Sequence, residues 1–597
     1  MRVADYIFKY LADYGIKHVF LVTGGGAMHL NDALNKEKRI KYICNHHEQG
    51  SAIAAEGYSR VSGELSVVSV TSGPGSTNAL TGVIGQWLDS VPVLYLSGQV
   101  KFETCIPSAE SDGIRQLGDQ EINIIDIVKP VTKYSKMVVD PTSIKAELDK
   151  AVHYATSGRP GPVWLDIPLN VQGAQIDESE LVCAELDDID IRPEAGVISK
   201  VIEELQNSER PVIIAGHGIR IAKAENVFLK LVDTLGIPVV TTFNGIDLIA
   251  SDSDKFIGRI GTLGSRSGNF ALQNADLILS IGSRNNIRQV SYNWEAFGRA
   301  AKKIIVDIDS AELNKKTVKA DIPILSDAKN FIQELSSKIG NNYQIKNSWL
   351  DWCLVRKDKY PVVLDEYKNK NEFAVHPYYF IDELTSVLDK DNVVIAGNGT
   401  ACVALFHAGK IKQGQRVFWN SGCASMGYGL PAAVGASVAT GRDVICITGD
   451  GSIQMNLQEL QTVKQYKLPI KIFLLNNSGY SSIKQTQTDF FNADYIGCDE
   501  ESGVSFPDNR KLAELYDFKY YKLDSTETMN DSINKVLKEC GPVICEVILT
   551  DDYKFAPKLS SKKMPDGRMI SKPLEDLFPF LDREEFSSNM IIPIIEE

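Results

Sequence analysis

A carboxylate and a carboxamide that follow neighbouring apolar runs are the most informative residues of this sequence. Asp450 lies in Gly449-Asp450-Gly451-Ser452, directly after the run 443–448, and Asn477 follows the next run, 468–475. Residues that end successive strands of one strand–helix–strand unit can converge on a single ion. Carboxylate and amide oxygens suit Mg²⁺ or Ca²⁺, and small residues let a diphosphate approach backbone N–H groups. The pattern therefore predicts a metal–diphosphate site.

A second polar group of residues lies near the N-terminus. Glu48 begins an Ala-rich stretch, 51–60, which has the composition of a helix with a small-residue face. Segment 71–78 reads as a strand that ends in a Gly/Pro turn followed by capping residues. Taken alone, Glu48 is explained by the preference of a carboxylate for a helix N-terminus, and segment 71–78 is an ordinary turn. Taken together, they are candidates for a ligand site.

Composition and charge exclude several function classes. The 597 residues carry a net charge of −14, which argues against a nucleic-acid partner because phosphate neutralisation needs a basic surface. The 10 cysteines show no metal-binding spacing and are expected to be reduced thiols. The N-terminus lacks the features of a signal or transit peptide, and the chain has no apolar run of membrane-spanning length. We therefore expect a cytoplasmic protein without a membrane partner.

The fold class predicted by the sequence is α/β, with three consecutive open domains whose sheets are mainly parallel. We place an N-terminal domain at 1–172, a central domain at 191–345 and a C-terminal domain at 376–555. Polar stretches at 177–190 and 341–375 read as linkers, and 556–597 is a tail whose length and polarity suit a lid. Ligands are expected at the carboxyl ends of the strands. The predicted strands are 18–22, 66–70, 91–96, 162–167, 211–215, 238–242, 277–281, 303–308, 393–396, 443–448, 470–475 and 543–549.

The combination of Glu48 with Asp450 and Asn477 resembles the thiamine diphosphate enzymes. Over nearly the whole chain, the sequence is most similar to the catalytic subunits of acetolactate synthase (acetohydroxyacid synthase). The matching segments are His47-Glu48-Gln49, Ser72 to Asn78, Asp89 to Pro92, Gly98 to Val100, Met426 to Ala433, Gly449 to Ser452, Gln454 to Asn456, and Asn476-Asn477.

The resemblance implies a role for each of these residues. Glu48 matches the glutamate that hydrogen-bonds the pyrimidine ring and drives the tautomer which accepts the C2 proton. Asp450 and Asn477 match the Mg²⁺ ligands, with the backbone carbonyl of Gly479 as the third. Gln120 aligns with a glutamine at the reaction centre, and Met426 with the residue that holds the cofactor bent; elsewhere it would be an ordinary core methionine. The remaining thiamine diphosphate positions are Gly25, Pro74, Asn78, Ala396, Gly397, Asn398, Gly399, Thr400, Gly449, Gly451, Ser452, Tyr480 and Ile483.

The central domain carries a weaker motif, Gly216-His217-Gly218, after the run 211–215. A lone Gly-x-Gly turn without the full fingerprint argues against an NAD site. The resemblance implies FAD instead, held for structure and not for redox chemistry. Arg284 and Arg288 echo the family's arginine pair and can pair with a diphosphate, although surface salt bridges are the plainer alternative. The FAD positions implied are Gly216, Gly218, Thr242, Gly261, Gly264, Gly282, Arg284, Arg288, Asp307 and Asp327.

The acceptor half of the reaction is where the sequence departs from the family. Thr486 stands where acetolactate synthases carry a tryptophan that helps to select a larger 2-ketoacid, so the pocket is expected to be wider and more polar. The donor half implies that pyruvate, or another 2-ketoacid, loses CO₂ and passes a two-carbon unit to a carbonyl acceptor. That acceptor is a second 2-ketoacid or, as in related flavin-containing carboligases, a nucleotide-linked 4-ketosugar.

Two other functions are alternatives to the carboligase. A simple 2-ketoacid decarboxylase or C–C hydrolase ends the reaction with a proton, and His29, His46 or His47 could supply the acid or base. A regulatory or structural paralogue would require an eroded site, whereas Glu48, Asp450 and Asn477 are all present. In the family, Glu48 and Asp450 come from different subunits, which implies a homodimer or tetramer.

Overall fold

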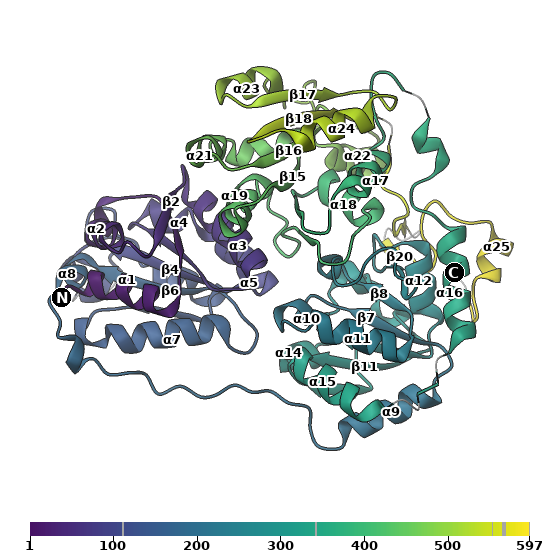
Figure 1. Ribbon diagram of the computed structural model, residues 1–597, viewed down its shortest axis with the longest axis horizontal. Helices are drawn as coiled ribbons and strands as arrows, with labels where there is room; N and C mark the ends of the chain where they lie inside the picture. The colour runs from purple at the N-terminus through teal and green to yellow at the C-terminus, as the bar shows by residue number, and fades with distance from the viewer. Residues whose placement is uncertain are drawn as a thin grey trace.

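Three six-stranded sheets, one in each third of the chain, form the framework of the protein. The computed structural model describes residues 1–109, 113–340, 343–344, 346–369, 371–551, 553–563 and 569–595. Every strand pair within the three sheets is parallel. Figure 1 places the N-terminal domain (purple and blue) on the left, the C-terminal domain (green) above and the middle domain (teal) at the lower right. The predicted α/β class is confirmed.

The strands are listed here by sheet. The N-terminal sheet contains β1 His18–Leu21, β2 Lys41–Cys44, β3 Ser66–Val70, β4 Val93–Gln99, β5 Tyr134–Met137 and β6 Val163–Pro168. The middle sheet contains β7 Pro211–Ala215, β8 Val239–Thr241, β9 Phe256–Arg259, β10 Leu277–Ile281, β11 Lys302–Asp307 and β12 Ile322–Leu325. The C-terminal sheet contains β13 Val393–Ala396, β14 Arg416–Phe418, β15 Val444–Gly449, β16 Ile470–Asn476, β17 Lys519–Leu523 and β18 Val543–Ile548.

Strand order fixes where ligands can bind. The outer sheets share one topology, β2-β1-β3-β4-β6-β5 and β14-β13-β15-β16-β18-β17, whereas the middle sheet runs β12-β11-β10-β7-β8-β9. The order reverses between β1 and β3, between β13 and β15, and between β7 and β10. In open parallel sheets, such reversal points open a crevice at the carboxyl ends of the strands. The protein therefore has three such crevices.

Helices cover the faces of each sheet. The N-terminal domain contains α1 Val3–Tyr14, α2 Met28–Lys36, α3 Glu48–Ser62, α4 Pro74–Thr77, α5 Leu80–Asp89, α6 Ile124–Val128, α7 Ile144–Thr156 and α8 Leu169–Gly173. The middle domain contains α9 Val197–Asn207, α10 Gly218–Ile221, α11 Glu225–Leu235, α12 Arg266–Asn274, α13 Ile287–Val290, α14 Ser310–Leu313, α15 Ala328–Ile339 and α16 Asn347–Lys359. The C-terminal domain contains α17 Pro377–Val387, α18 Thr400–Ala408, α19 Gly429–Thr440, α20 Asp450–Ile453, α21 Glu459–Tyr466, α22 Ser481–Phe491, α23 Asn509–Leu515 and α24 Met529–Lys538.

The contact between α3 and α19 joins the two outer domains (Figure 1). A Cβ added to Gly57 would lie 2.2 Å from the Ala432 carbonyl oxygen, and one added to Gly435 would lie 1.7 Å from the Ala54 carbonyl oxygen. The small residues seen in the sequence therefore let the two helix backbones touch. Gly57 lies beside Ala432 and Ala54 lies beside Gly435, so the two helices run antiparallel.

The second predicted linker contains a helix. Within 341–375, α16 packs on the middle domain: Trp349, Leu350 and Cys353 are buried, and Trp349 Nε1 donates to the Pro211 carbonyl at 3.0 Å. The helix was not predicted because its buried face is narrow and charged residues lie at several of its other positions. The middle domain therefore extends beyond residue 345.

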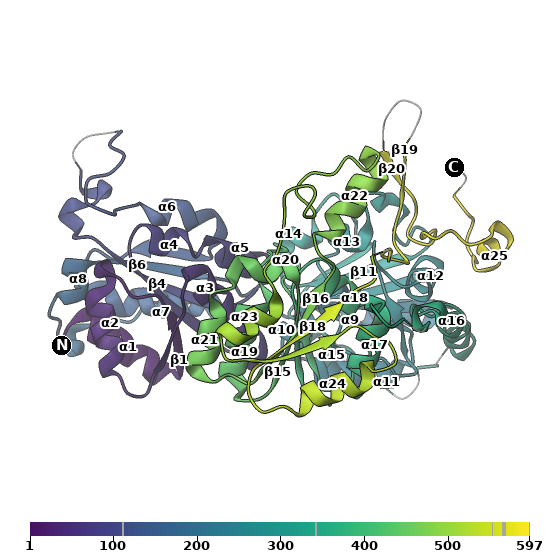
Figure 2. The ribbon, with the colours of Figure 1, turned by 90° about the horizontal axis from the view of Figure 1, so that it is seen from above.

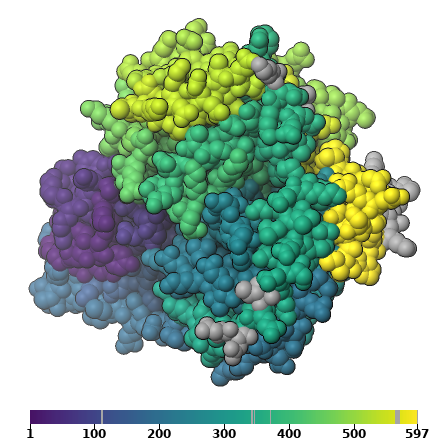
Figure 3. All heavy atoms as spheres, turned by 45° about the vertical axis from the view of Figure 1, so that its right-hand side comes forward, coloured from purple at the N-terminus to yellow at the C-terminus, as the bar shows by residue number. Residues whose placement is uncertain are grey.

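The C-terminal tail is fastened to the middle domain. It contains the antiparallel strand pair β19 Ser561–Lys563 and β20 Met569–Ser571, followed by α25 Arg583–Ser588. Asn269 Nδ2 donates to the Leu574 carbonyl at 2.8 Å. Arg299 Nη1 forms an ion pair with Glu575 Oε1 at 2.7 Å. Figure 3 shows the yellow tail lying against the teal surface of the middle domain. A lid function for the tail stays a prediction. Among the described residues, no helix is both long and apolar enough to cross a bilayer.

Candidate active site and middle-domain cavity

The predicted diphosphate positions gather at the carboxyl ends of β13, β15 and β16. The amide of Gly397 donates to the Ile447 carbonyl at 2.7 Å, which ties the end of β13 to β15. Gly449 pairs with Leu475, so β15 and β16 end at nearly the same level. Asp450 and Asn477, which follow these strands, therefore lie at the same edge of the sheet. This edge is the crevice at the β13/β15 reversal, where the sheet topology allows a ligand.

Asp450 is the carboxylate of this edge. It is 3% exposed, and its two oxygens accept the backbone N–H groups of Gly451 at 2.7 Å and Asn477 at 3.1 Å. Burial raises the pKa of Asp450 to about 6, although these N–H groups oppose the shift. A cation in contact with the carboxylate would favour its ionised form and relieve the burial cost.

Asn477 gives the most direct indication of a cation site. Its Nδ2 donates to Ser481 Oγ at 3.0 Å and to the Tyr553 hydroxyl at 3.1 Å. Its Oδ1 is buried, and no described residue donates a hydrogen bond to it. An unpaired buried acceptor costs about 1–3 kcal/mol, and a carboxamide oxygen beside a carboxylate is a normal ligand pair for Mg²⁺. The residues present therefore fit a hard divalent cation.

The glycines beside this pair differ in what they face. A Cβ added to Gly451 would lie 2.2 Å from Cε1 of Tyr480, and one added to Gly479 would lie 2.2 Å from the Cys498 carbonyl oxygen, so these two glycines allow close packing of the wall. A Cβ on Gly449 would meet nothing within 4 Å, so this glycine faces open space. Gly399 precedes α18 with φ +75°, a conformation that favours glycine, and places Thr400 at the helix start.

The loop of Met426 is tied to the same strand ends. Asn398 Nδ2 donates to the Ser425 carbonyl at 2.6 Å, and the Gly427 amide donates to Ser452 Oγ at 3.0 Å. These bonds hold Met426 at the N-terminus of α19, next to the diphosphate positions. Ile483 lies on α22 and is 49% exposed in the single chain.

The pyrimidine-side positions gather in the N-terminal domain, at the β1/β3 reversal. Glu48 is the first residue of α3, is 8% exposed, and its Oε2 accepts from Asn78 Nδ2 at 3.0 Å. Pro74 begins α4, and a Cβ added to Gly73 would lie 2.7 Å from the Gln120 carbonyl oxygen. Gly25 lies in the turn after β1, with open space around its Cα. The fold therefore brings Glu48, Pro74, Asn78, Gln120 and Gly25 to one edge.

The two halves lie apart within one chain. Because α3 and α19 are antiparallel with Ala54 beside Gly435, Glu48 falls level with Gly441, beyond the C-terminus of α19. The loop of Met426 precedes the N-terminus of α19. With a rise of 1.5 Å per residue, the 12 residues of α19 put the two ends of the helix about 18 Å apart. Gly50, near Glu48, instead faces Glu459. Glu48 and the loop of Met426 therefore lie at opposite ends of α19 within one chain.

A cavity of about 460 Å³ opens where the three domains meet. Its floor is the β7/β10 reversal of the middle sheet, whose order is that of dinucleotide-binding folds. Its volume lies within the range of cofactor pockets, about 300–1,000 Å³. The predicted FAD positions that line it are Gly218, Thr242, Gly282, Arg284, Arg288, Asp307 and Asp327.

The other three predicted FAD glycines lie behind the cavity wall. A Cβ on Gly216 would lie 2.2 Å from the Gly282 carbonyl oxygen, and one on Gly261 would lie 2.6 Å from the Arg288 carbonyl oxygen. A Cβ on Gly264 would lie 2.6 Å from Asn269 Oδ1. These glycines allow close packing of the wall and do not face the cavity. Asp327 Oδ1 caps α15 by accepting two backbone N–H groups, so its carboxylate already has a structural role.

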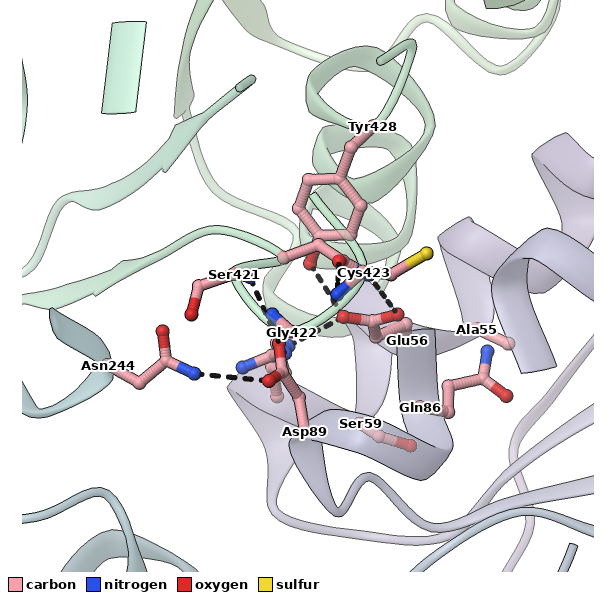
Figure 4. Close-up of polar contacts among 12 residues, drawn as sticks. Ala55, Glu56, Ser59, Gln86, Asp89, Asn244, Ser421, Gly422, Cys423 and Tyr428 are labelled. Atoms are coloured by element: carbon pink, nitrogen blue, oxygen red, sulfur yellow. Dashed lines mark hydrogen bonds and ion pairs between the residues drawn. The ribbon is translucent and has the colours of Figure 1, made fainter. Parts of the chain in front are cut away.

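A buried polar joint holds the three domains together beside this cavity (Figure 4). The joint consists of Glu56, Arg60 and Asp89 with Asn244, Asn420 and Tyr428. Arg60 bridges the two carboxylates, Glu56 at 2.9 Å and Asp89 at 2.7 Å. Asn244 of the middle domain donates to Asp89 at 3.3 Å, and Tyr428 of the C-terminal domain donates to Glu56 at 3.0 Å. The pKa of Glu56 is raised because its carboxyl group is fully buried. Removing one partner of such a buried pair costs about 3–5 kcal/mol.

Sequence reasoning missed the residues that other domains contribute. The cavity is also lined by Leu88, Ser90 and Arg159 of the N-terminal domain and by Ser421 of the C-terminal domain. No local pattern marks these residues, because they meet only when the domains dock. Tyr553, which contacts Asn477, lies in the polar segment after the last strand of the C-terminal sheet and carries no motif.

Comparison with known proteins agrees with this geometry. Residues 1–122, 198–335 and 397–547 match the family models described as the thiamine pyrophosphate enzyme N-terminal TPP binding domain, central domain and C-terminal TPP binding domain. The acetolactate synthase large subunit of Lactococcus lactis subsp. lactis (strain IL1403) is 32% identical over 564 residues, 93% of each chain. The probable acetolactate synthase large subunit of Methanocaldococcus jannaschii is 33% identical over 587 residues, 96% of this chain and 95% of its own. The acetolactate synthase large subunit of Porphyra purpurea is 31% identical over 562 residues, 92% of each chain.

Proposed function

The chain belongs to the thiamine pyrophosphate enzyme family and is a thiamine diphosphate-dependent transferase of the acetolactate synthase type, and we propose that it takes CO₂ from pyruvate and transfers the remaining two-carbon unit to a carbonyl acceptor. The observation that carries the proposal is the unpaired, buried Oδ1 of Asn477 beside Asp450. Pyruvate as donor rests on the names of the relatives.

The metal and the diphosphate each have residues suited to hold them. Asp450, Asn477 and the Gly479 carbonyl would bind Mg²⁺, and the N-terminus of α18 with the Thr400 hydroxyl would bind the diphosphate. When bound, thiamine diphosphate supplies the nucleophilic carbon that adds to the keto group and holds the two-carbon unit after CO₂ leaves.

Glu48 would exchange a proton with the cofactor's pyrimidine ring. Oε2 of Glu48 accepts a hydrogen bond from Asn78 Nδ2, so Oε1 is left to carry or release the proton. A Cβ built on Gly75 would lie 3.5 Å from Oε1. The antiparallel packing of α3 on α19 supports a homodimer at least, in which Glu48 of one chain serves the Asp450 site of the other.

FAD is the ligand that we propose for the middle-domain cavity. The guanidinium of Arg288 lies 4.7 Å from the centroid of the Phe243 ring and faces this space, where it can pair with a diphosphate. Replacing Arg288 by alanine is expected to weaken FAD binding by about 10–100-fold, because a hydrogen bond to a charged group is worth about 1.5–3 kcal/mol. Flavin absorbance after titration and dialysis measures the effect. Lys302→Ala, which removes a surface cation paired with Glu204, is the control; equal flavin content in both variants would contradict the assignment.

We propose a nucleotide-linked 4-ketosugar as the acceptor. Thr486 is exposed on α22, and its hydroxyl donates to the Ser482 carbonyl at 3.0 Å, so a side chain smaller and more polar than the indole of the synthases stands at this position. Figure 2 shows α22 near the upper edge of the molecule in that view. A second pyruvate is the other candidate, and the names of the relatives favour it.

Replacing Thr486 by tryptophan is expected to raise the ratio of acetolactate to sugar product by about tenfold, because a filled pocket excludes the bulkier acceptor. Competition between pyruvate and the ketosugar, followed by product analysis, measures this ratio. Thr488→Trp, two residues along the same exposed helix, is the matched control. An unchanged ratio in Thr486→Trp would remove Thr486 from the acceptor pocket.

Product analysis tests the whole proposal. The enzyme is supplied with pyruvate, thiamine diphosphate, Mg²⁺ and FAD, with and without a nucleotide-linked 4-ketosugar. The proposal predicts slow turnover until the sugar is added and then a sugar that carries two more carbons. Abundant acetolactate without the sugar would establish a synthase, and acetaldehyde as the main product in both cases would establish a decarboxylase.

A further inference from the structure

A buried phenol outside every predicted site position touches the metal-site carboxamide. Tyr553 follows β18, is 5% exposed, and its hydroxyl lies 2.6 Å from Thr400 Oγ1 and 2.6 Å from Ser481 Oγ. The same hydroxyl accepts from Asn477 Nδ2 at 3.1 Å. We call Thr400, Ser481 and Tyr553 the hydroxyl cluster. It joins the starts of α18 and α22 to the segment after β18.

The hydrogen-bond capacity of the cluster accounts for both hydrogens of the Asn477 amide. One goes to Ser481 Oγ and the other to the Tyr553 oxygen. A phenol oxygen has one hydrogen and two acceptor sites, so Tyr553 can accept from Asn477 and Ser481 while it donates to Thr400. The Thr400 hydroxyl hydrogen then remains available to Ser481 Oγ, 3.2 Å away, or to a bound anion.

The cluster binds only the nitrogen side of the carboxamide. Nδ2 contacts Ser481 Oγ and the Tyr553 hydroxyl, whereas the buried Oδ1 has no donor among the described residues. The cluster therefore occupies the amide nitrogen and leaves the oxygen for a ligand.

We propose that Tyr553 is a positioning residue for the metal: its hydroxyl, with that of Ser481, holds the Asn477 amide nitrogen so that Oδ1 is presented to Mg²⁺. The inference rests on the proposed metal site and names a residue that the family motifs do not include. Burial keeps the pKa of the Tyr553 phenol above its ordinary value, so the hydroxyl stays protonated and neutral at physiological pH. Partners that orient a metal ligand typically change metal affinity by about 10–100-fold when removed.

The test is the Mg²⁺ dependence of thiamine diphosphate binding in Tyr553→Phe, measured on the full-length protein without substrate. Quenching of tryptophan fluorescence is followed as Mg²⁺ is titrated at fixed thiamine diphosphate. We expect the Mg²⁺ concentration at half-saturation to rise by about tenfold, and thiamine diphosphate affinity at saturating Mg²⁺ to stay within about twofold of wild type. Ser481→Ala, which removes the other acceptor of the amide, is expected to shift the curve in the same direction.

Tyr378→Phe is the matched control. Tyr378 is a fully buried tyrosine of the same domain whose hydroxyl contacts His407 and accepts from the Ala556 amide at 3.1 Å, without touching Asn477. Its loss should leave the Mg²⁺ curve in place. An unchanged curve in both Tyr553→Phe and Ser481→Ala would overturn the proposal. Weakened thiamine diphosphate binding that saturating Mg²⁺ does not restore would also overturn it, by placing Tyr553 on the diphosphate through Thr400. Mg²⁺-independent binding in the wild type would refute the metal site itself.

Discussion

Glu48→Gln is expected to lower turnover of pyruvate by about 10²–10⁴-fold, the usual contribution of a positioned acid–base group. Glutamine keeps the length of the side chain and an oxygen for Asn78 Nδ2, but it cannot hold and release a proton. The binding of thiamine diphosphate and Mg²⁺ is expected to stay near the wild-type level, because the C-terminal domain holds the metal and the diphosphate and glutamine can still hydrogen-bond on the pyrimidine side. Steady-state turnover and a fluorescence titration of the cofactor separate the two quantities.

Glu64→Gln is the control for this variant. Glu64 is an exposed glutamate just beyond the other end of α3, where Gly63 ends the helix with φ +68°. Glu64→Gln removes the same charge near the same helix, at the end far from the crevice. Turnover of Glu48→Gln at more than half the wild-type rate would contradict the assigned role.

Asp450→Asn is expected to raise the Mg²⁺ concentration at half-saturation by more than about 100-fold. Loss of a residue that only orients a metal ligand changes metal affinity by about 10–100-fold, and loss of the ligand's charge should cost more. The substitution preserves the volume of the side chain but removes the charge that offsets that of the cation. Because the diphosphate depends on the metal, binding of thiamine diphosphate should weaken in parallel at low Mg²⁺. Calorimetric titration of the cofactor at several Mg²⁺ concentrations gives both affinities.

Asp443→Asn removes a carboxylate just before the opposite end of the same strand, β15, where it lies 3.7 Å from Lys471 Nζ. It should leave the Mg²⁺ requirement unchanged. Equal behaviour of the two aspartate variants would show that Asp450 is not a metal ligand.

Burial explains which strands the sequence revealed. The twelve predicted strands are the four central strands of each six-stranded sheet, and the six strands of these sheets that were missed are their edge strands. Central strands of a parallel sheet are covered on both faces and read as continuous apolar runs, such as β3 and β10. Edge strands such as β2 and β5 expose Lys41 and Lys136 and show too short an apolar pattern.

The same distinction holds for the candidate site. Asp450, Asn477 and Glu48 lie at the ends of single elements, so local spacing and family resemblance were enough to propose them. The joint around Glu56 and Asp89, the cavity wall from Leu88 to Arg159, and Tyr553 depend on contacts between segments far apart in the chain. Their side chains carry no local pattern, because docking of the domains alone brings them together.

Mixing two inactive chains tests the central claim, that one site is built from Glu48 of one chain and Asp450 of another. Glu48→Gln and Asp450→Asn are co-expressed with different tags, and pyruvate turnover is measured on the mixture. Random pairing makes half of the dimers mixed, and each mixed dimer has one intact site and one doubly altered site, so about a quarter of wild-type activity is expected. No recovery above that of either variant alone would mean that Glu48 and Asp450 act within the same chain, and would contradict the account.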